Sequence, residues 1–257
     1  MDKQSIIETK TQLIEYFQDK EKNKKDWMIG TEHEKFIFSL KNFHSVNYKG
    51  ENGIEQLLLI LEKNSGWEGI YENKNIIGLI SDNKSSISLE PGGQLELSGA
   101  PLKNLHMTCE ETGTHLKELR KALQRLDLGM AGFGFHPISA RENSNFMPKG
   151  RYEIMKKWMP KVGSMGLDMM LRTCTIQVNL DYSNEIDMAK KFKTALTLQP
   201  IITALFANSP FYEGKPSNFL SLRTEVWRNT DPSRCGVPTC IFDNNFGYEM
   251  WVDYLLN

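Results

Sequence analysis

The sequence predicts an α+β fold in which helices flank an antiparallel sheet. Short extended segments follow one another and are separated by turn-forming residues at 72–75 and 82–85, as in hairpin-connected strands. Segments of helical periodicity lie among them without the regular strand–helix alternation of a parallel sheet. The 257 residues contain no internal repeat and no linker rich in Pro and Gly, so we expect a single domain over 1–257.

Apolar spacing places the individual elements. The segment 104–127 has the most regular helical pattern, since its apolar residues are alternately four and three positions apart. The segment 172–181 alternates between apolar and polar residues, which is typical of a strand. We expect Ser183 to cap a long helix that Pro200 bends. The expected helices are 5–19, 54–62, 104–127 and 183–206, and the expected strands are 27–40, 67–71, 76–81, 86–90, 94–98, 129–135 and 172–181.

Composition excludes several classes of protein. The 31 basic and 32 acidic side chains leave a net charge of −1, which gives no general attraction to nucleic acid or anionic lipid. The longest apolar run, Leu57–Leu61, is far shorter than the ~18 residues that span a bilayer. The first residues have no apolar segment of a signal peptide. The four cysteines are scattered without a CxxC pair, so we expect reduced thiols and a cytoplasmic location.

Two predicted strands each carry a pair of glutamates on one face. Glu32 and Glu34 are two residues apart, so both carboxylates point the same way. A turn at 91–93 places Glu90 and Glu96 together on the polar face of a hairpin. If both pairs belong to one sheet, the carboxylates converge and repel one another unless cations are bound. Since Mg²⁺ prefers carboxylate oxygens, we expect these four glutamates to be its ligands; the alternative is two ordinary solvated strand faces.

Basic side chains complement these carboxylates. Arg172 stands at the head of a predicted strand, and Arg234 lies in the polar loop 231–236, where a guanidinium can reach a phosphate or carboxylate. The sequence has no Walker A loop, no GxGxxG fingerprint and no HExxH pair. Phosphoryl transfer is still possible, because bound magnesium and arginines can neutralise the phosphates. The residues by themselves predict a magnesium-dependent enzyme that acts on anionic substrates.

Five blocks of the sequence resemble glutamate–cysteine ligase of the plant and alphaproteobacterial type: 30–36, 87–101, 147–152, 159–181 and 204–210. The resemblance implies a fold like the catalytic domain of glutamine synthetase, with an antiparallel sheet curved into a funnel. It also implies ATP-dependent ligation of the glutamate γ-carboxylate to cysteine through a γ-glutamyl phosphate, the first step of glutathione synthesis. Activation is needed because a free carboxylate is ionised at pH 7 and is a poor acyl donor.

The resemblance also implies roles for single residues. The family's magnesium ligands fall on the same four glutamates, and its partners are the small molecules glutamate, cysteine and ATP. Where the family loop usually reads Arg-Thr-Gly, this sequence has Arg234, Cys235 and Gly236. A regulatory disulfide of plant members starts at the position of Cys109 but lacks its partner here, so we expect no such switch. We expect Arg223 and Arg234 to act in catalysis and the following residues to bind substrate: Lys149, Arg151, Arg172, Gln177 and Asn179.

An apolar stripe marks the end of the sequence. Trp251, Tyr254 and Leu255 lie on one face of a predicted helix, and the resemblance implies that family members continue beyond 248–255. We therefore expect an N-terminal portion of a longer ligase, with this stripe exposed and prone to self-association. The alternative to a ligase is an inactive fragment that binds only glutamate or a partner subunit.

Overall fold

The computed structural model describes residues 6–257, and its contacts divide the chain into two compact units. The sheet unit comprises Ile29–Asn179 and Thr203–Gly236 and contains every candidate site residue. The helical unit comprises Met1–Met28, Leu180–Ile202 and Val237–Asn257. No helix in the described part of the chain is long and apolar enough to cross a membrane. The α+β class and the antiparallel sheet are confirmed, whereas the single domain over 1–257 stays a prediction.

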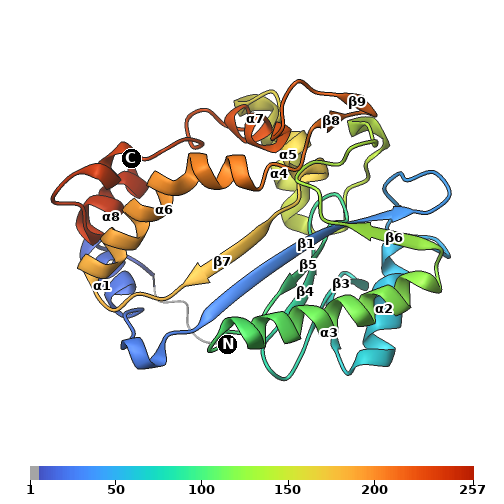
Figure 1. The fold of residues 1–257 in the computed structure, drawn as a ribbon, viewed down its shortest axis with the longest axis horizontal. Helices are drawn as coiled ribbons and strands as arrows, with labels where there is room; N and C mark the ends of the chain where they lie inside the picture. The colour runs from blue at the N-terminus through green and yellow to red at the C-terminus, as the bar shows by residue number, and fades with distance from the viewer. Residues whose placement is uncertain (1–5) are drawn as a thin grey trace. The chain divides into compact units, whose positions relative to one another are not determined.

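The sheet unit is built on the strands β1 (Ile29–Ser39), β2 (Glu68–Glu72), β3 (Asn75–Ile80), β4 (Ser86–Leu89), β5 (Leu95–Ser98), β6 (Leu128–Ala131) and β7 (Ile176–Leu180). Their order is β2-β3-β4-β5-β1-β6, and β7 also pairs with β1 (Figure 1). β1 joins the two parts of the sheet, because Glu32–Lys35 pair with β5 and Phe36–Ser39 pair with β6. Neighbouring strands along this order run antiparallel.

One face of the sheet is covered by α2 (Ile54–Ser65) and α3 (Leu105–Gln124), as Figure 1 shows. α3 starts where the Asn104 side chain accepts a hydrogen bond from the amide of Met107, at 3.1 Å. Burying each large aliphatic side chain here stabilises the fold by roughly 1.5–3 kcal/mol. The buried residues include Leu57, Leu58, Ile87, Leu89, Leu95, Leu97, Leu119 and Leu123. Ile87, Leu89, Leu95 and Leu97 take alternate positions in β4 and β5, so the polar residues between them lie on the opposite face of the sheet.

Further helices and a short hairpin complete the two units. Pro200 lies inside the long helix α6 (Glu185–Leu205), as the sequence predicts. The sheet unit also holds α4 (Gly150–Val162), α5 (Gly166–Arg172), α7 (Leu222–Arg228), a 3-10 turn (Arg141–Asn143) and the hairpin of β8 (Phe211–Tyr212) and β9 (Lys215–Pro216). The helical unit holds α1 (Lys10–Gln18), most of α6 (Glu185–Leu205), α8 (Tyr248–Leu256) and 3-10 turns at Lys24–Asp26 and Thr239–Phe242.

The structure differs from the strand predicted over 172–181. Arg172 is the last residue of helix α5, and β7 begins only at Ile176. Asp168 and Arg172 are one helical turn apart and form a buried ion pair. Such a pair stabilises a helix, whereas the alternation of apolar residues by itself favours a strand. The prediction that Arg172 heads a strand is therefore wrong.

Some predicted boundaries move by a few residues. α1 begins at Lys10, and Ser5 lies outside the described residues. At the start of α6 the side chain of Asn184, rather than Ser183, accepts a hydrogen bond from the amide three residues later, at 2.9 Å. The strand expected over 129–135 is shorter in the structure, where β6 forms only its first part.

The predicted apolar stripe near the end of the chain is only partly exposed. The Trp251 ring packs edge-on against Phe192, with 4.9 Å between ring centroids, and also contacts Phe246. The Tyr254 ring stacks on Trp251, with 5.3 Å between ring centroids. Tyr254 is 44% exposed and Leu255 is 56% exposed. Exposure therefore concentrates in the last turn of α8.

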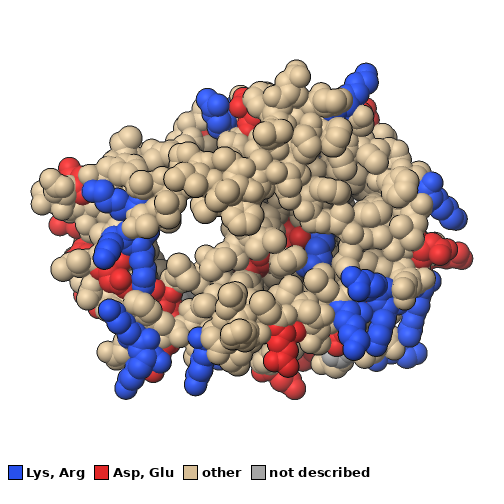
Figure 2. All heavy atoms as spheres, in the orientation of Figure 1, with Lys and Arg blue, Asp and Glu red and all other residues tan. Residues whose placement is uncertain are grey.

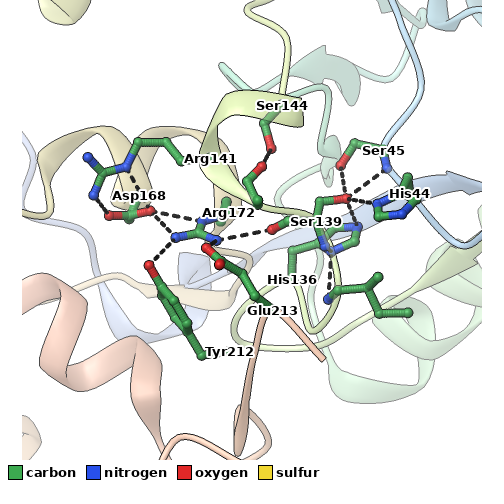
Figure 3. Close-up of polar contacts among 12 residues, drawn as sticks. His44, Ser45, His136, Ser139, Arg141, Ser144, Asp168, Arg172, Tyr212 and Glu213 are labelled. Carbon is green, nitrogen blue, oxygen red and sulfur yellow. Dashed lines mark hydrogen bonds and ion pairs between the residues drawn. The ribbon is translucent and has the colours of Figure 1, made fainter. Parts of the chain in front are cut away.

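A buried histidine illustrates the polar interior of the sheet unit (Figure 3). His136 is 2% exposed, and its Nδ1 accepts hydrogen bonds from the amides of Ile138 at 3.3 Å and Ser139 at 3.0 Å. Burial, followed by the nearby side chains of His44 and Arg172, lowers the pKa of His136 to about 4. Protonation would turn the Nδ1 acceptor into a donor facing two N–H groups, so the folded protein keeps this ring neutral.

We expect the protein to lose stability as the pH falls from 6.5 towards 4. In the unfolded chain His136 binds a proton near its ordinary pKa of 6.5, whereas the folded state resists protonation until about 4. The contribution of His136 to the free energy of unfolding is complete above pH 6.5 and is smaller by about 2 kcal/mol at pH 5. Denaturant unfolding at pH 7 and pH 5 measures this loss. His136→Asn keeps an acceptor for both amides without titrating, so its loss should be smaller by that amount; equal losses would contradict the assignment.

Candidate functional site

β1 and β5 bring the predicted carboxylates to one face of the sheet. Glu34 lies directly opposite Glu96. The amide of Glu90 donates to the carbonyl of Gln94 at 2.9 Å, which is the hairpin pairing that the sequence predicts. Glu34, Glu90 and Glu96 line a cavity of about 340 Å³, which we call the carboxylate hollow.

The pKa values of these glutamates reflect their burial and mutual repulsion. Burial, and then the charges of Glu90 and Glu96, raise the pKa of Glu34 to about 7, although the amide of Thr175 donates to Glu34 Oε2 at 2.9 Å. Burial and the charge of Glu96 also raise the pKa of Glu90, against the opposing effects of Lys149 and Arg151. The hollow therefore favours the binding of a cation or a proton.

Glu32 lies beside the hollow and does not line it. Asn179 Nδ2 donates to Glu32 Oε1 at 3.1 Å, and Gln177 Nε2 donates to Glu32 Oε2. Gln177 itself lines the hollow. These two predicted substrate-binding residues are thus engaged with Glu32 in this structure.

The carboxylate hollow suits magnesium by its donor chemistry. Among residues 6–257, no three His, Cys, Asp or Glu side chains are close enough together to hold one metal ion. Mg²⁺ does not need three, because it usually takes one or two protein carboxylates and completes its shell with water and phosphate oxygens. Glu34, Glu90 and Glu96 provide hard oxygen atoms whose mutual repulsion a cation would relieve.

Two arginines face the same hollow. Arg223 of α7 lines it, and the Arg223 Nε is buried with no hydrogen-bond partner among the described residues. Burial lowers the pKa of Arg223, while the charge of Glu34 acts in the opposite direction. Arg151 Nη2 lies 3.8 Å from Glu90 Oε1. The Lys149 ammonium group donates to the carbonyl of Leu89 at 2.7 Å. Lys149 does not line the hollow.

Arg172 does not line the hollow, and Figure 3 shows its contacts with Asp168, Ser139 and Glu213 instead. Its side chain is fully buried; Nε donates to Asp168 at 2.8 Å, and Nη1 donates to Glu213 at 2.9 Å and to the carbonyl of Ser139 at 3.0 Å. Asp168 also accepts a hydrogen bond from Arg141 Nε, at 3.1 Å. Arg172 thus joins α5 to the β8–β9 hairpin, and substrate binding by this residue is a prediction that the geometry does not favour.

Arg234 also lies apart from the carboxylates. Its side chain is 75% exposed and pairs with Asp231 at 3.7 Å. It does not line the hollow. An exposed ion pair of this kind contributes little to stability, and the catalytic role of Arg234 stays a prediction.

Sequence reasoning missed Gln94 as a site residue. Gln94 is 2% exposed and lines the hollow; its Nε2 donates to the carbonyl of Thr173 at 2.7 Å, and its Oε1 accepts from the amide of Gly92 at 2.9 Å. Gln94 thereby fastens the β4–β5 turn to the end of α5. The signal available in the sequence was its side-chain amide, which lies between Glu90 and Glu96 on the polar face of the predicted hairpin.

Residues 28–257 match the family model described as Glutamate-cysteine ligase family 2 (GCS2). The chain belongs to the glutamate-cysteine ligase family 2. The chloroplastic glutamate–cysteine ligase of Medicago truncatula is 52% identical over 249 residues, which are 97% of this chain and 48% of that protein. The chloroplastic enzyme of Brassica juncea gives the same identity and coverage. That of Arabidopsis thaliana is 51% identical over 97% of this chain and 47% of its own length.

These comparisons confirm the resemblance to glutamate–cysteine ligase of the plant type. The chain spans about half the length of the curated relatives it matches. These relatives are named as chloroplastic proteins, and the cytoplasmic location of this chain stays a prediction.

Proposed function

We propose that this chain provides the metal- and substrate-binding sheet of an ATP-dependent glutamate–cysteine ligase. The ligase would join the γ-carboxylate of glutamate to the amine of cysteine, giving γ-glutamylcysteine for glutathione synthesis. The observation that carries the proposal is the pairing of Glu34 with Glu96 in a hollow that Arg223 also lines. Membership of the glutamate-cysteine ligase family 2 supports the same reaction. We further infer that the sheet belongs to a curved funnel like that of glutamine synthetase.

The proposed ligation has two steps, phosphorylation of glutamate and attack by cysteine. A γ-carboxylate oxygen of glutamate attacks the terminal phosphorus of ATP, and the bond from that phosphorus to ADP breaks. The cysteine nitrogen then attacks the acyl carbon, the carbon–oxygen bond to phosphate breaks, and the amine loses a proton. The carboxylate is thereby converted from a poor acyl donor into a reactive one.

The chain's own residues would orient and neutralise these groups. Arg223 and Arg151 carry positive charge at the hollow, where they can stabilise oxygen atoms that become more negative during phosphoryl transfer. Glu34, Glu90 and Glu96 would hold Mg²⁺, which when bound neutralises phosphate charge. Glu32 would help to hold Mg²⁺ from the edge of the hollow. The remaining proposed contacts to substrate or phosphate are Lys149, Gln177 and Asn179 around the hollow and Arg234 from its loop.

We expect Glu96→Gln to lower γ-glutamylcysteine formation at least about 100-fold, because it removes a metal-binding oxygen from the hollow. Without magnesium its melting temperature should hold or rise, since one charge fewer is repelled. With magnesium and ATP its stabilisation should be smaller than in the unchanged chain. Mass spectrometry of the product and thermal melts measure these effects.

The matched control is Glu68→Gln, the same exchange at an exposed position of β2 outside the hollow. It should change neither product formation nor the magnesium response. Full activity of Glu96→Gln beside an active control would overturn the metal assignment.

The alternative is a chain that binds glutamate without turning it over. This alternative is favoured by one observation: the chain covers only about half of the length of each relative. Calorimetry with glutamate, run beside the product assay on this chain and on the Medicago truncatula enzyme, separates the two. Binding without product supports the alternative, and product formation by this chain excludes it.

A further inference from the structure

A second cavity, of about 360 Å³, lies on the helix-covered side of the sheet. Its walls come from α3, from the turn between β3 and β4, and from Leu97 of β5; we call it the α3 hollow. Leu97 points into the core, whereas its neighbour Glu96 lines the carboxylate hollow. Because successive strand residues point to opposite faces, the two cavities lie on opposite sides of the sheet.

The described lining of the α3 hollow has acidic side chains and no basic ones. Glu110, Glu111 and Glu118 line it, and no lysine or arginine of the described chain does. Basic side chains gather at the lower right of Figure 2, over α2 and α3, yet none of them reaches the lining. The carboxylate hollow differs in this respect, because Arg151 and Arg223 line it beside its glutamates. The α3 hollow therefore attracts a cation from solution.

Two buried polar atoms of the same cavity have no partner among the described residues. His115 lines the hollow and is 3% exposed, and its Nε2 is one of these two atoms. Burial, and then the charges of Lys35 and His33, lower its pKa to about 3, so the ring is neutral and can make a hydrogen bond to a ligand through Nε2. Beside it, Glu111 Oε2 is also buried without a partner in residues 6–257. The unpartnered carboxylate oxygen of Glu111 favours a ligand that donates a hydrogen bond.

The remaining lining selects the kind of cation. Trp67, Leu102 and Met107 give the hollow an apolar side, and an indole ring attracts an organic cation through its face. An inorganic ion needs several oxygen ligands, and this apolar side of the hollow supplies none. We propose that the α3 hollow binds a small organic cation, an ammonium or guanidinium group on a short aliphatic chain. This site is independent of the proposed ligase reaction.

Calorimetric titration of the whole chain with n-butylammonium chloride tests the proposal, with sodium chloride of equal concentration as reference. We expect saturable binding at one site with a dissociation constant on the order of 1 mM. The neutral probe n-butanol should bind at least about tenfold more weakly, because it lacks the charge that the three glutamates attract. In NMR spectra the Trp67 indole N–H signal should shift along the same binding curve.

The double variant Glu110→Gln/Glu118→Gln removes two charges from the lining and should weaken n-butylammonium binding at least about tenfold. The matched control, Glu51→Gln/Glu153→Gln, removes two exposed charges elsewhere in the sheet unit and should bind like the unchanged chain. Circular dichroism confirms that both variants are folded. Absence of saturable binding, equal affinity for n-butanol, or unchanged affinity of the first double variant would overturn the proposal.

Discussion

Asp168→Asn should destabilise the protein by about 3–5 kcal/mol, because it removes the negative charge that pairs with a fully buried arginine. Asp168 and Arg172 are both completely buried, and Asp168 also accepts a hydrogen bond from Arg141. An asparagine keeps the shape of the side chain but loses its charge, and the guanidinium of Arg172 keeps only Glu213, a side chain 39% exposed, as an anionic partner. The melting temperature should fall by about 10 °C.

The control for this prediction is an ion pair of the same unit at the surface. Arg228 is 75% exposed and lies 3.4 Å from Glu225 within α7. Arg228→Gln should change stability by less than about 1 kcal/mol, since exposed pairs contribute little. Thermal melts of both variants at the same pH provide the comparison. If Asp168→Asn melts like Arg228→Gln, the buried pair does not hold α5 to its surroundings.

The hairpin that carries two of the glutamates could be predicted from the sequence because its geometry is local. A strand has a period of two, and a turn of known length fixes which residues face each other. The pairing of Ser88 with Glu96 follows from these two rules and is found in the structure. The approach of Glu34 to Glu96 also followed, once both strands were assigned to one sheet.

The position of Arg172 could not be predicted in the same way. Its local sequence alternates like a strand, and its strongest partner, Asp168, becomes a neighbour only if the segment is helical. Its contact with Glu213 joins residues 41 positions apart. The spacing of Asp168 and Arg172 is a local signal for a helix, whereas the contact with Glu213 has none, so the arginine was predicted to bind substrate instead of joining α5 to the β8–β9 hairpin. Gln94 has a local signal in its place on the polar face of the hairpin, but its partners Met170 and Thr173, in α5 and just after it, are distant in sequence.

Gly92→Ala should destabilise the protein by about 3 kcal/mol and impair the carboxylate hollow together with it. A Cβ atom at Gly92 would lie 2.3 Å from the carbonyl oxygen of Leu171 and 2.8 Å from its Cα, both backbone atoms of α5. Backbone cannot move aside as a flexible side chain can, so the turn must separate from α5. That movement would strain the hydrogen bonds of Gln94, which connect the same two segments.

The matched control for Gly92→Ala is Gly113→Ala in the middle of α3, where no atom lies within 4 Å of the new Cβ. This exchange should stabilise the helix by up to about 1 kcal/mol. Because Glu90 and Gln94 flank the altered turn, Gly92→Ala should also reduce the rise in melting temperature that magnesium and ATP produce, whereas Gly113→Ala should leave it intact. Thermal melts with and without these ligands measure both effects. A Gly92→Ala chain that is as stable and as responsive as Gly113→Ala would show that the turn and α5 need not touch to form the hollow.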